Sequence, residues 1–270
     1  MIRVSRMSLG AIAIAICAAV LEGQSPTVRV TYLYDNTAAT AGVKPDWGFA
    51  CLVQGSGRTV LFDTGANASI LRENLGALKI DPGSVDALVL SHDHDDHTQG
   101  LDALGRRPGL PVYYAQGFAT EVVARLTAAG LRLTPVSRSV PIFPGFAVSD
   151  EMGVQAKIVE DALLVETTQG LVVIVGCAHP GIIPMLRQIK ETSGRPIYMV
   201  LGGFHLLQTP AEQIKQIVAD FKTMGIAYAG PTHCTGDEAI KQFRQAYGDH
   251  FISGGVGTVV EAPVPAKRRP

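Results

Sequence analysis

The sequence of 270 residues predicts an α/β fold in which two mixed β-sheets pack face to face under helices, a four-layer αββα sandwich. Two observations lead to this prediction. Each half of the chain begins with strands of hairpin type and continues with alternating helices and strands. No linker, low-complexity segment or short-period repeat divides residues 25–270, and an apolar content of 47% is sufficient for a large core. We therefore expect a single domain over residues 25–270.

The elements follow from apolar spacing and turn residues. In the first half we expect strands at residues 27–36, 48–53, 59–62, 85–90 and 111–115. The helices of this half are expected at residues 68–80, 101–104 and 119–129. A Pro- and Gly-rich stretch, residues 131–153, is expected to be a loop. In the second half we expect strands at residues 155–158, 162–167, 171–175, 197–201, 227–229 and 257–261, and helices at 180–192, 211–224 and 237–247.

The N-terminus has the order of residues that is typical of a secretory signal. Arg3 and Arg6 precede an apolar run at residues 7–21, and a polar segment at 22–26 follows it. The run is shorter than the roughly 20 residues that a membrane helix needs, so a retained anchor is the less favoured alternative. We expect residues 1–24 to be a cleaved signal peptide and the mature protein to be periplasmic or secreted, without membrane insertion.

Charge and cysteine content limit the classes of partner. The 23 basic and 24 acidic residues are mixed along the chain, so no broad cationic face is available to bind nucleic acid. We expect a small-molecule substrate, and nothing in the sequence indicates an oligomeric state. Cys51, Cys177 and Cys234 remain after the signal, an odd number that cannot form a complete disulfide framework. Metal ligation, a single Cys177–Cys234 bridge and simple burial all stay open.

Six of the seven histidines fall in four short segments, each where a predicted strand ends. In the densest segment His92 and His94 are two residues apart, so in extended backbone both rings project to the same side and can bind one ion. Asp96 and His97 follow as the chain turns and can bind a second ion. Neutral imidazoles with a single carboxylate favour zinc, with iron or manganese as less favoured occupants.

Other segments supply the remaining candidates. His179 and His233 each follow a strand and precede a helix, and we expect both to be metal ligands. Cys177 is a possible ligand or bridge, or is packed beneath the site. His205 is expected to face the substrate or support a ligand, although ligation or burial in the core remain alternatives. Asp63 ends the hairpin strand and is expected to hydrogen-bond a ligating imidazole.

The expected mechanism is attack by activated water. Two ions that share a water molecule lower its pKa and present hydroxide to a carbonyl or phosphorus centre. Asp96 would orient this nucleophile, and Asp63 and His205 complete the candidate catalytic residues. His205 and Thr235 are the candidate substrate-binding residues. The sequence contains no Gly-x-Ser-x-Gly elbow that would supply a serine nucleophile.

At these residues the chain resembles the metallo-β-lactamase superfamily, whose hallmark is His-x-His-x-Asp-His after a strand, here His92, His94, Asp96 and His97. The Asp-Thr-Gly at 63–65 strengthens the resemblance, which covers residues 27–263. Three segments, 176–179, 202–205 and 232–236, look like the subgroup named for dihydropterin ribofuranosylaminobenzene 5′-phosphate synthase.

The resemblance implies the four-layer sandwich and metal-dependent hydrolysis of a small ester-like substrate, either a lactone, a β-lactam or a phosphoester. The synthase activity belongs to intracellular pterin cofactor assembly, whereas this chain is expected to be exported, so the subgroup name does not indicate the substrate. Some members of the superfamily bind iron, which makes an iron-dependent redox enzyme on the same fold one alternative. A non-catalytic exported metal-binding protein is the other.

Overall fold

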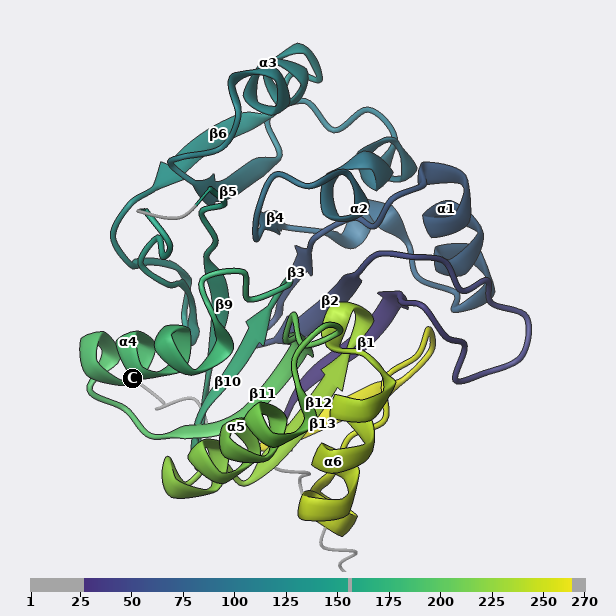
Figure 1. Cartoon of the computed structure of the whole chain (residues 1–270). Coiled ribbons are helices and arrows are strands. Elements are labelled where there is room, and N and C mark those ends of the chain that lie inside the picture. The colour runs from purple at the N-terminus through teal and green to yellow at the C-terminus, as the bar shows by residue number, and fades with distance from the viewer. Residues whose placement is uncertain (1–26, 155–156, 264–270) are drawn as a thin grey trace, which may run out of the picture.

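The computed structural model describes residues 27–154 and 157–263 (Figure 1). The predicted signal peptide, residues 1–24, lies outside these ranges, as do the first two residues of the strand predicted at 155–158. Within the described ranges, no helix is long and apolar enough to cross a membrane.

Two mixed sheets form the centre of the molecule. The first sheet has, in spatial order, β13 (Val259–Pro263), β1 (Thr27–Tyr34), β2 (Ala50–Gly55), β3 (Arg58–Phe62), β4 (Ala87–Leu90), β5 (Pro111–Ala115) and β6 (Arg132–Val136). The second sheet has β12 (Tyr228–Thr232), β11 (Ile197–Gly203), β10 (Gly170–Val175), β9 (Ala162–Thr167), β8 (Phe146–Val148) and β7 (Val140–Phe143). Parallel pairing runs from β3 to β6 in the first sheet and from β10 to β12 in the second.

The alternation of side chains along each strand builds the core between the sheets. In β10, Val172 and Ile174 point toward the first sheet, where they join one cluster with Tyr32 and Phe62. The other face of β10 joins a different cluster with helices, through Leu171, Val173 and Val175. Because every side chain of β10 is buried on one face or the other, the strand reads as a continuous apolar run.

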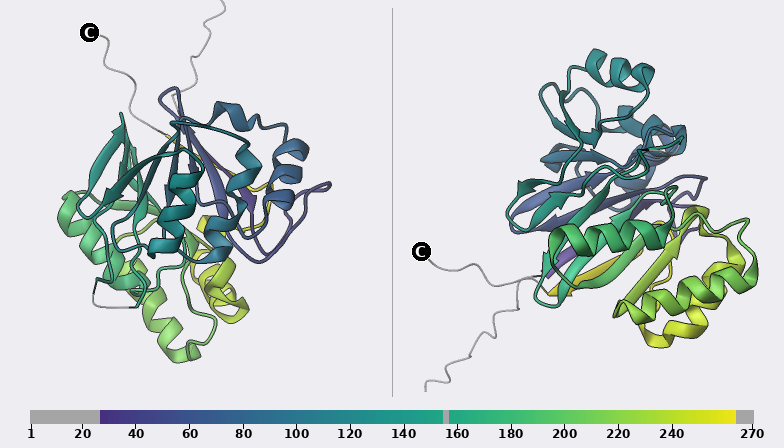
Figure 2. Two further views of the ribbon diagram at one scale, coloured as in Figure 1. Left: turned by 90° about the horizontal axis from the view of Figure 1, so that it is seen from above. Right: turned by 60° about the vertical axis from the view of Figure 1, so that its left-hand side comes forward.

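Helices cover both outer faces (Figure 2). The second sheet packs against α4 (Ile182–Ser193), α5 (Ala211–Thr223) and α6 (Asp237–Tyr247). The first sheet packs against α1 (Ala68–Ala77) and α3 (Thr120–Ala128). Short helical segments complete the chain at η1 (Pro82–Ser84), α2 (Asp95–Thr98), η2 (Gln99–Leu104), η3 (His233–Thr235) and η4 (Gly248–His250). The predicted four-layer αββα sandwich is therefore confirmed.

Apart from shifts of up to three residues at the ends of elements, three predicted elements differ from the structure. The stretch 131–153 forms β6, β7 and β8 instead of a loop. Its prolines concealed the strands, because Pro135 and Pro141 lie on strands at the sheet edges, where a missing N–H is tolerated. Residues 157–158 form a bend rather than part of a strand. The helix predicted at 101–104 begins earlier, because α2 starts at Asp95 and continues directly into η2.

Candidate metal centre

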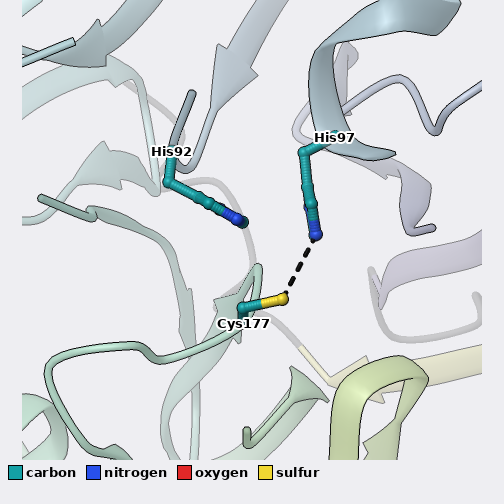
Figure 3. A group of neighbouring side chains, drawn as sticks. All are labelled: His92, His97 and Cys177. Atoms are coloured by element: carbon teal, nitrogen blue, oxygen red, sulfur yellow. Dashed lines mark hydrogen bonds between the residues drawn. The ribbon is translucent and has the colours of Figure 1, made fainter. Parts of the chain in front are cut away.

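The candidate centre lies where strands of both sheets end. His92 follows β4 of the first sheet, whereas His179, His205 and His233 follow β10, β11 and β12 of the second. Figure 3 shows the ring nitrogens of His92 and His97 and the thiol of Cys177 turned toward one another. His97 lies on α2, and Cys177 follows β10. Packing the two sheets face to face therefore brings together imidazoles that are far apart in the sequence.

Sharp backbone turns at the strand ends aim several of these side chains. Asp63, Ala178, His205 and His233 all have a left-handed backbone, with φ of 55°, 58°, 52° and 52°. Non-glycine residues adopt this conformation at a cost of about 1–3 kcal/mol, and such strain clusters at functional sites. Each of the four residues follows the end of a strand, so the turns redirect the chain at the same edge of the sandwich.

The six predicted metal ligands form two groups of three. In the first ligand group, comprising His92, His94 and His179, the candidate ligand atoms all lie within 4.8 Å of one another. The second ligand group meets the same limit and comprises Asp96, His97 and His233. The two groups adjoin, because the ring centroids of His92 and His97 are 4.1 Å apart. The structure thus brings together every residue that the sequence indicated as a ligand.

The Cys177 thiol lies beside both groups. Its Sγ is 3.3 Å from Nε2 of His97, and Cys177 also forms a ligand-sized cluster with His92 and His97. The Sγ of Cys234 is 3.1 Å away, yet Cys51, Cys177 and Cys234 are all free thiols in the structure. The disulfide that the sequence left open is therefore not formed. The position of the Cys177 sulfur fits a metal ligand, either of one ion or bridging two.

Asp63 and Ser91 fix the protonation of two imidazoles. The Asp63 carboxylate accepts from Nδ1 of His97 at 2.7 Å, which is the hydrogen bond to an imidazole that the sequence predicted. The Ser91 hydroxyl donates to the same carboxylate at 2.8 Å, and it can therefore accept from Nδ1 of His92, also at 2.8 Å. With both Nδ1 atoms protonated, both Nε2 atoms carry free lone pairs.

Glu160 and Asn36 have the same effect on two further rings, those of His179 and His233. Nδ1 of His179 lies 3.1 Å from Oε2 of Glu160, and Nδ1 of His233 lies 3.1 Å from Oδ1 of Asn36. Asn36 also donates through Nδ2 to the backbone carbonyl of His233 at 2.9 Å, which orients its amide. In the neutral form of both rings, Nε2 is therefore the unprotonated atom.

These lone pairs fit a metal ion. Nε2 of His92 is buried and has no hydrogen-bond partner, and the Nε2 atoms of His97 and His233 approach to 3.3 Å. Burial of His92 lowers its imidazole pKa well below the usual value, which keeps the ring neutral. Buried lone pairs without donors are costly, whereas imidazole nitrogens are preferred ligands of borderline-soft divalent cations.

Asp96 supplies the single carboxylate of the centre. Its Oδ2 lies 3.3 Å from Nε2 of His233 and 3.9 Å from Nε2 of His97. Burial alone would raise the pKa of this carboxyl, but in the metal-free protein protonation of His97 and His233 at Nε2 supplies a hydrogen bond from His233 and a positive charge on His97, which lower that pKa well below its usual value. Asp96 is therefore a carboxylate with an exposed fraction of 21%, which leaves it accessible from solvent.

The two predicted substrate-facing residues have different outcomes. His205 is exposed, and its ring lies 4.4 Å from that of His179, so it borders the centre on the solvent side. The prediction for Thr235 needs correction. Its side chain is fully buried, and its hydroxyl donates to the Thr232 carbonyl at 2.6 Å and accepts from the Phe204 backbone at 3.0 Å. The hydroxyl fixes the loop instead of facing a substrate.

The sequence reasoning missed Glu160, Ser91, Asn36 and Trp47. Glu160 is fully buried and binds the turn that carries Cys177. The position of Ser91 directly before the histidine cluster was an available signal, because strand-end hydroxyls often orient a neighbouring ligand. Glu160 lies between two predicted strands, Asn36 is the last residue of a predicted strand, and Trp47 lies in a long loop, so no local pattern identified them as parts of the site.

Comparison with known proteins identifies the family. The family model described as "Metallo-beta-lactamase superfamily" matches residues 45–183, just over half of the chain. The chain belongs to the metallo-beta-lactamase superfamily. This match spans β2 to the start of α4 and includes the first ligand group together with Asp96 and His97. The resemblance inferred from the histidine cluster is thereby confirmed.

Two superfamily relatives are similar over most of the chain. The 7,8-dihydropterin-6-methyl-4-(beta-D-ribofuranosyl)-aminobenzene-5′-phosphate synthase of Methanocaldococcus jannaschii is 28% identical over 248 residues, covering 76% of this chain and 84% of the relative. The crystal structure of Tm1679, described as a metal-dependent hydrolase of the beta-lactamase superfamily, is also 28% identical, with a TM-score of 0.73. It covers 87% of this chain and 99% of Tm1679.

The fold is shared more widely. The metallo-beta-lactamase fold protein YhfI from Bacillus subtilis has a TM-score of 0.64 at 17% identity and covers 88% of this chain and all of YhfI. At this identity the similarity shows the fold alone. It agrees with the two mixed sheets and outer helices described above.

Proposed function

We propose that this superfamily member is an exported hydrolase that uses two zinc ions to cleave a small ester-like substrate, either a lactone, a β-lactam or a phosphoester. The observation that carries the proposal is the pair of adjoining ligand groups around the unpaired, buried Nε2 of His92. Similarity to Tm1679, which is described as a metal-dependent hydrolase, supports the reaction class.

The two ligand groups would each hold one metal ion. The first ligand group would hold one ion and the second ligand group the other, with the Cys177 sulfur beside both. Bound zinc lowers the pKa of water and polarises a carbonyl or phosphoryl oxygen. Asp63, Glu160 and Asn36 hold three of the rings with Nε2 unprotonated, so the ligands need no rearrangement to bind metal.

Two polar side chains face the position of a substrate. Asp96 is ionised and partly exposed, so its carboxylate can accept a hydrogen bond from the attacking water and hold it in line. His205 borders the centre beside His179 and can donate a hydrogen bond to a substrate oxygen. The attacking group is water, since the mechanism requires no serine or cysteine nucleophile.

Zinc is favoured over iron by the donor set. Five of the six ligand residues and the adjacent thiol offer nitrogen or sulfur, and only Asp96 offers oxygen. Iron sites of the two-histidine, one-carboxylate type contain a higher share of oxygen. Export is supported by the basic, apolar and polar order of residues 3–26. The intact mass of the protein recovered from culture medium or periplasm measures whether the signal is removed.

The test is a metal and activity comparison. Purified His92→Ala/His94→Ala protein should contain at most one equivalent of zinc and lose hydrolysis of a panel of lactones, β-lactams and phosphoesters. His250→Ala is the matched control, because His250 is exposed and stacks on Tyr228 outside the ligand groups. Full activity of metal-free protein would refute the proposal.

A further inference from the structure

Two hollows flank His205 at the surface beside the metal centre. The first hollow, about 420 Å³, lies between α4 and α5 and is bordered by His179. The second hollow, about 410 Å³, is bordered by Trp47 and Cys234. Both hollows are also bordered by Thr209 and Gln213. A substrate whose reacting group occupies the centre would therefore extend from His205 into these hollows.

The walls of the first hollow are largely apolar. They include the side chains of Ile183, Phe204 and Ile217. Of its described lining residues, Asp220 is the one carboxylate, and Arg187 lies 3.7 Å from that carboxylate. Among the described residues that line either hollow there is no lysine or arginine. A phosphate or carboxylate held away from the ions would find no lysine or arginine among these lining residues, and Arg187 beside the hollow already pairs with Asp220. An uncharged apolar group would instead lie against the apolar walls.

The rim of the second hollow carries two apolar side chains, Trp47 and Leu207, beside the polar Gln208 and Gln213. Trp47 and Leu207 are 48% and 61% exposed, and they are two of only four large hydrophobic side chains that are exposed in the described part of the chain. Exposed apolar side chains are ordinary when they are scattered singly, but here two of them line one hollow beside a polar centre.

The backbone fixes Trp47 against the second ligand group. Its ring centroid is 4.8 Å from that of His233. The adjacent Phe49 N–H donates to the Asp96 carbonyl at 3.2 Å. Gly48 permits this approach, since a Cβ there would lie 2.5 Å from the same carbonyl oxygen. The indole therefore forms a positioned wall of the substrate site.

We propose that the substrate carries an uncharged, apolar arm of acyl or alkyl type, which binds along these hollows while its ester-like group reaches the metal centre. This inference rests on the proposed function for the position of the reacting group. It separates this chain from its M. jannaschii relative, whose name specifies a 5′-phosphate compound. The apolar walls and the apolar side chains of the rim stabilise the arm by removing its surface from water.

The test uses Trp47, which is the only tryptophan in the sequence, so its fluorescence reports binding without turnover. The zinc-loaded full chain is titrated with butanoate, hexanoate, octanoate and octanedioate. Burial of each added methylene should tighten binding about fourfold, which corresponds to about 0.8 kcal/mol. Octanedioate should bind about tenfold or more weakly than octanoate, because its second carboxylate would be buried without a partner.

Exposed residues supply the variants, so folding is not at risk. Leu207→Gln should weaken octanoate binding by about threefold to tenfold and leave butanoate unchanged, since only the longer arm reaches the rim. Val259→Gln is the matched control, because Val259 is a 49% exposed residue of β13 that lines neither hollow. Affinity that is independent of chain length, or tight binding of octanedioate, would overturn the inference.

The outcomes separate the two proposals. Hydrolysis of esters without any dependence on chain length refutes the apolar arm and leaves the hydrolase intact. A fourfold gain per methylene without hydrolysis of any ester supports the arm and refutes the reaction.

Discussion

Replacing Glu160 by Gln tests whether a single buried carboxylate positions the first ligand group. Oε1 of Glu160 accepts from the backbone N–H groups of Cys177 and Ala178, each at 2.7 Å. Oε2 accepts from the backbone N–H and Nδ1 of His179 at 2.9 and 3.1 Å. A glutamine amide can satisfy one of these pairs through its oxygen, but its NH₂ group then faces the other two donors.

The loss can be worked from these four contacts. Hydrogen bonds to a charged group contribute about 1.5–3 kcal/mol each, so losing two of them should lower the free energy of unfolding by about 3–6 kcal/mol. When the amide oxygen faces the N–H groups of Cys177 and Ala178, Nδ1 of His179 loses its acceptor, and zinc affinity should then also fall about 10-fold to 100-fold. Guanidinium denaturation of metal-free protein measures the first quantity, and competition with a zinc chelator measures the second.

Glu166→Gln is the matched control. Glu166 is about half exposed and pairs with Arg195 at 3.0 Å on the surface, so its replacement should cost less than about 1 kcal/mol and leave zinc affinity unchanged. If Glu160→Gln unfolds within 1 kcal/mol of the parent and binds zinc equally well, the role assigned to this carboxylate is wrong.

Three further predictions concern packing, pH and metal. Gly100→Ala should lower the free energy of unfolding by about 1–3 kcal/mol, measured by denaturant unfolding, because a Cβ there would lie 1.8 Å from the Thr64 carbonyl oxygen. Gly76→Ala is the control, because Gly76 lies on α1 with open space around it, and it should raise the free energy of unfolding by about 0.5–1 kcal/mol. Equal effects of the two substitutions would contradict this prediction. Burial raises the pKa of Asp161, so the folded protein retains a proton that the unfolded chain releases, and the free energy of unfolding should fall as pH rises above about 4. The stability of Asp161→Asn relative to the parent should therefore increase from pH 4 to 8, whereas that of the exposed control Asp249→Asn should not. A stability difference between Asp161→Asn and the parent that is constant with pH would refute this. Removal of metal by a chelator should lower the melting temperature, and added zinc should raise it again with increasing concentration. A melting temperature that does not respond to zinc would show that the centre binds none.

The sequence was most informative where chemistry depends on local spacing. His92 and His94 are two residues apart at the end of a buried strand, so their shared direction follows from the backbone alone. Asp63 was also predictable, because it follows a strand of the predicted hairpin. In the structure its Oδ2 lies 2.7 Å from Nδ1 of His97, as expected. The other ligands also lie at strand ends, so the fold alone brings them together. That fold could be predicted from the pattern of apolar residues.

The sequence was least informative where a contact joins distant segments. Asn36 and His233 are 197 positions apart, and no periodicity connects them. Glu160 lies in an irregular segment, so its burial against the turn at 177–179 depends on tertiary packing. Thr235 shows the opposite error, because its place beside a ligand suggested a substrate contact although the loop uses its hydroxyl.

Anomalous X-ray diffraction at the zinc absorption edge, from crystals of the zinc-loaded protein, tests the two ligand groups directly. We expect two peaks, one bound by the first ligand group and the other by the second ligand group. A single peak would show that the centre binds one ion and not two. Peaks elsewhere, or none beside the buried Nε2 of His92, would contradict the metal centre itself.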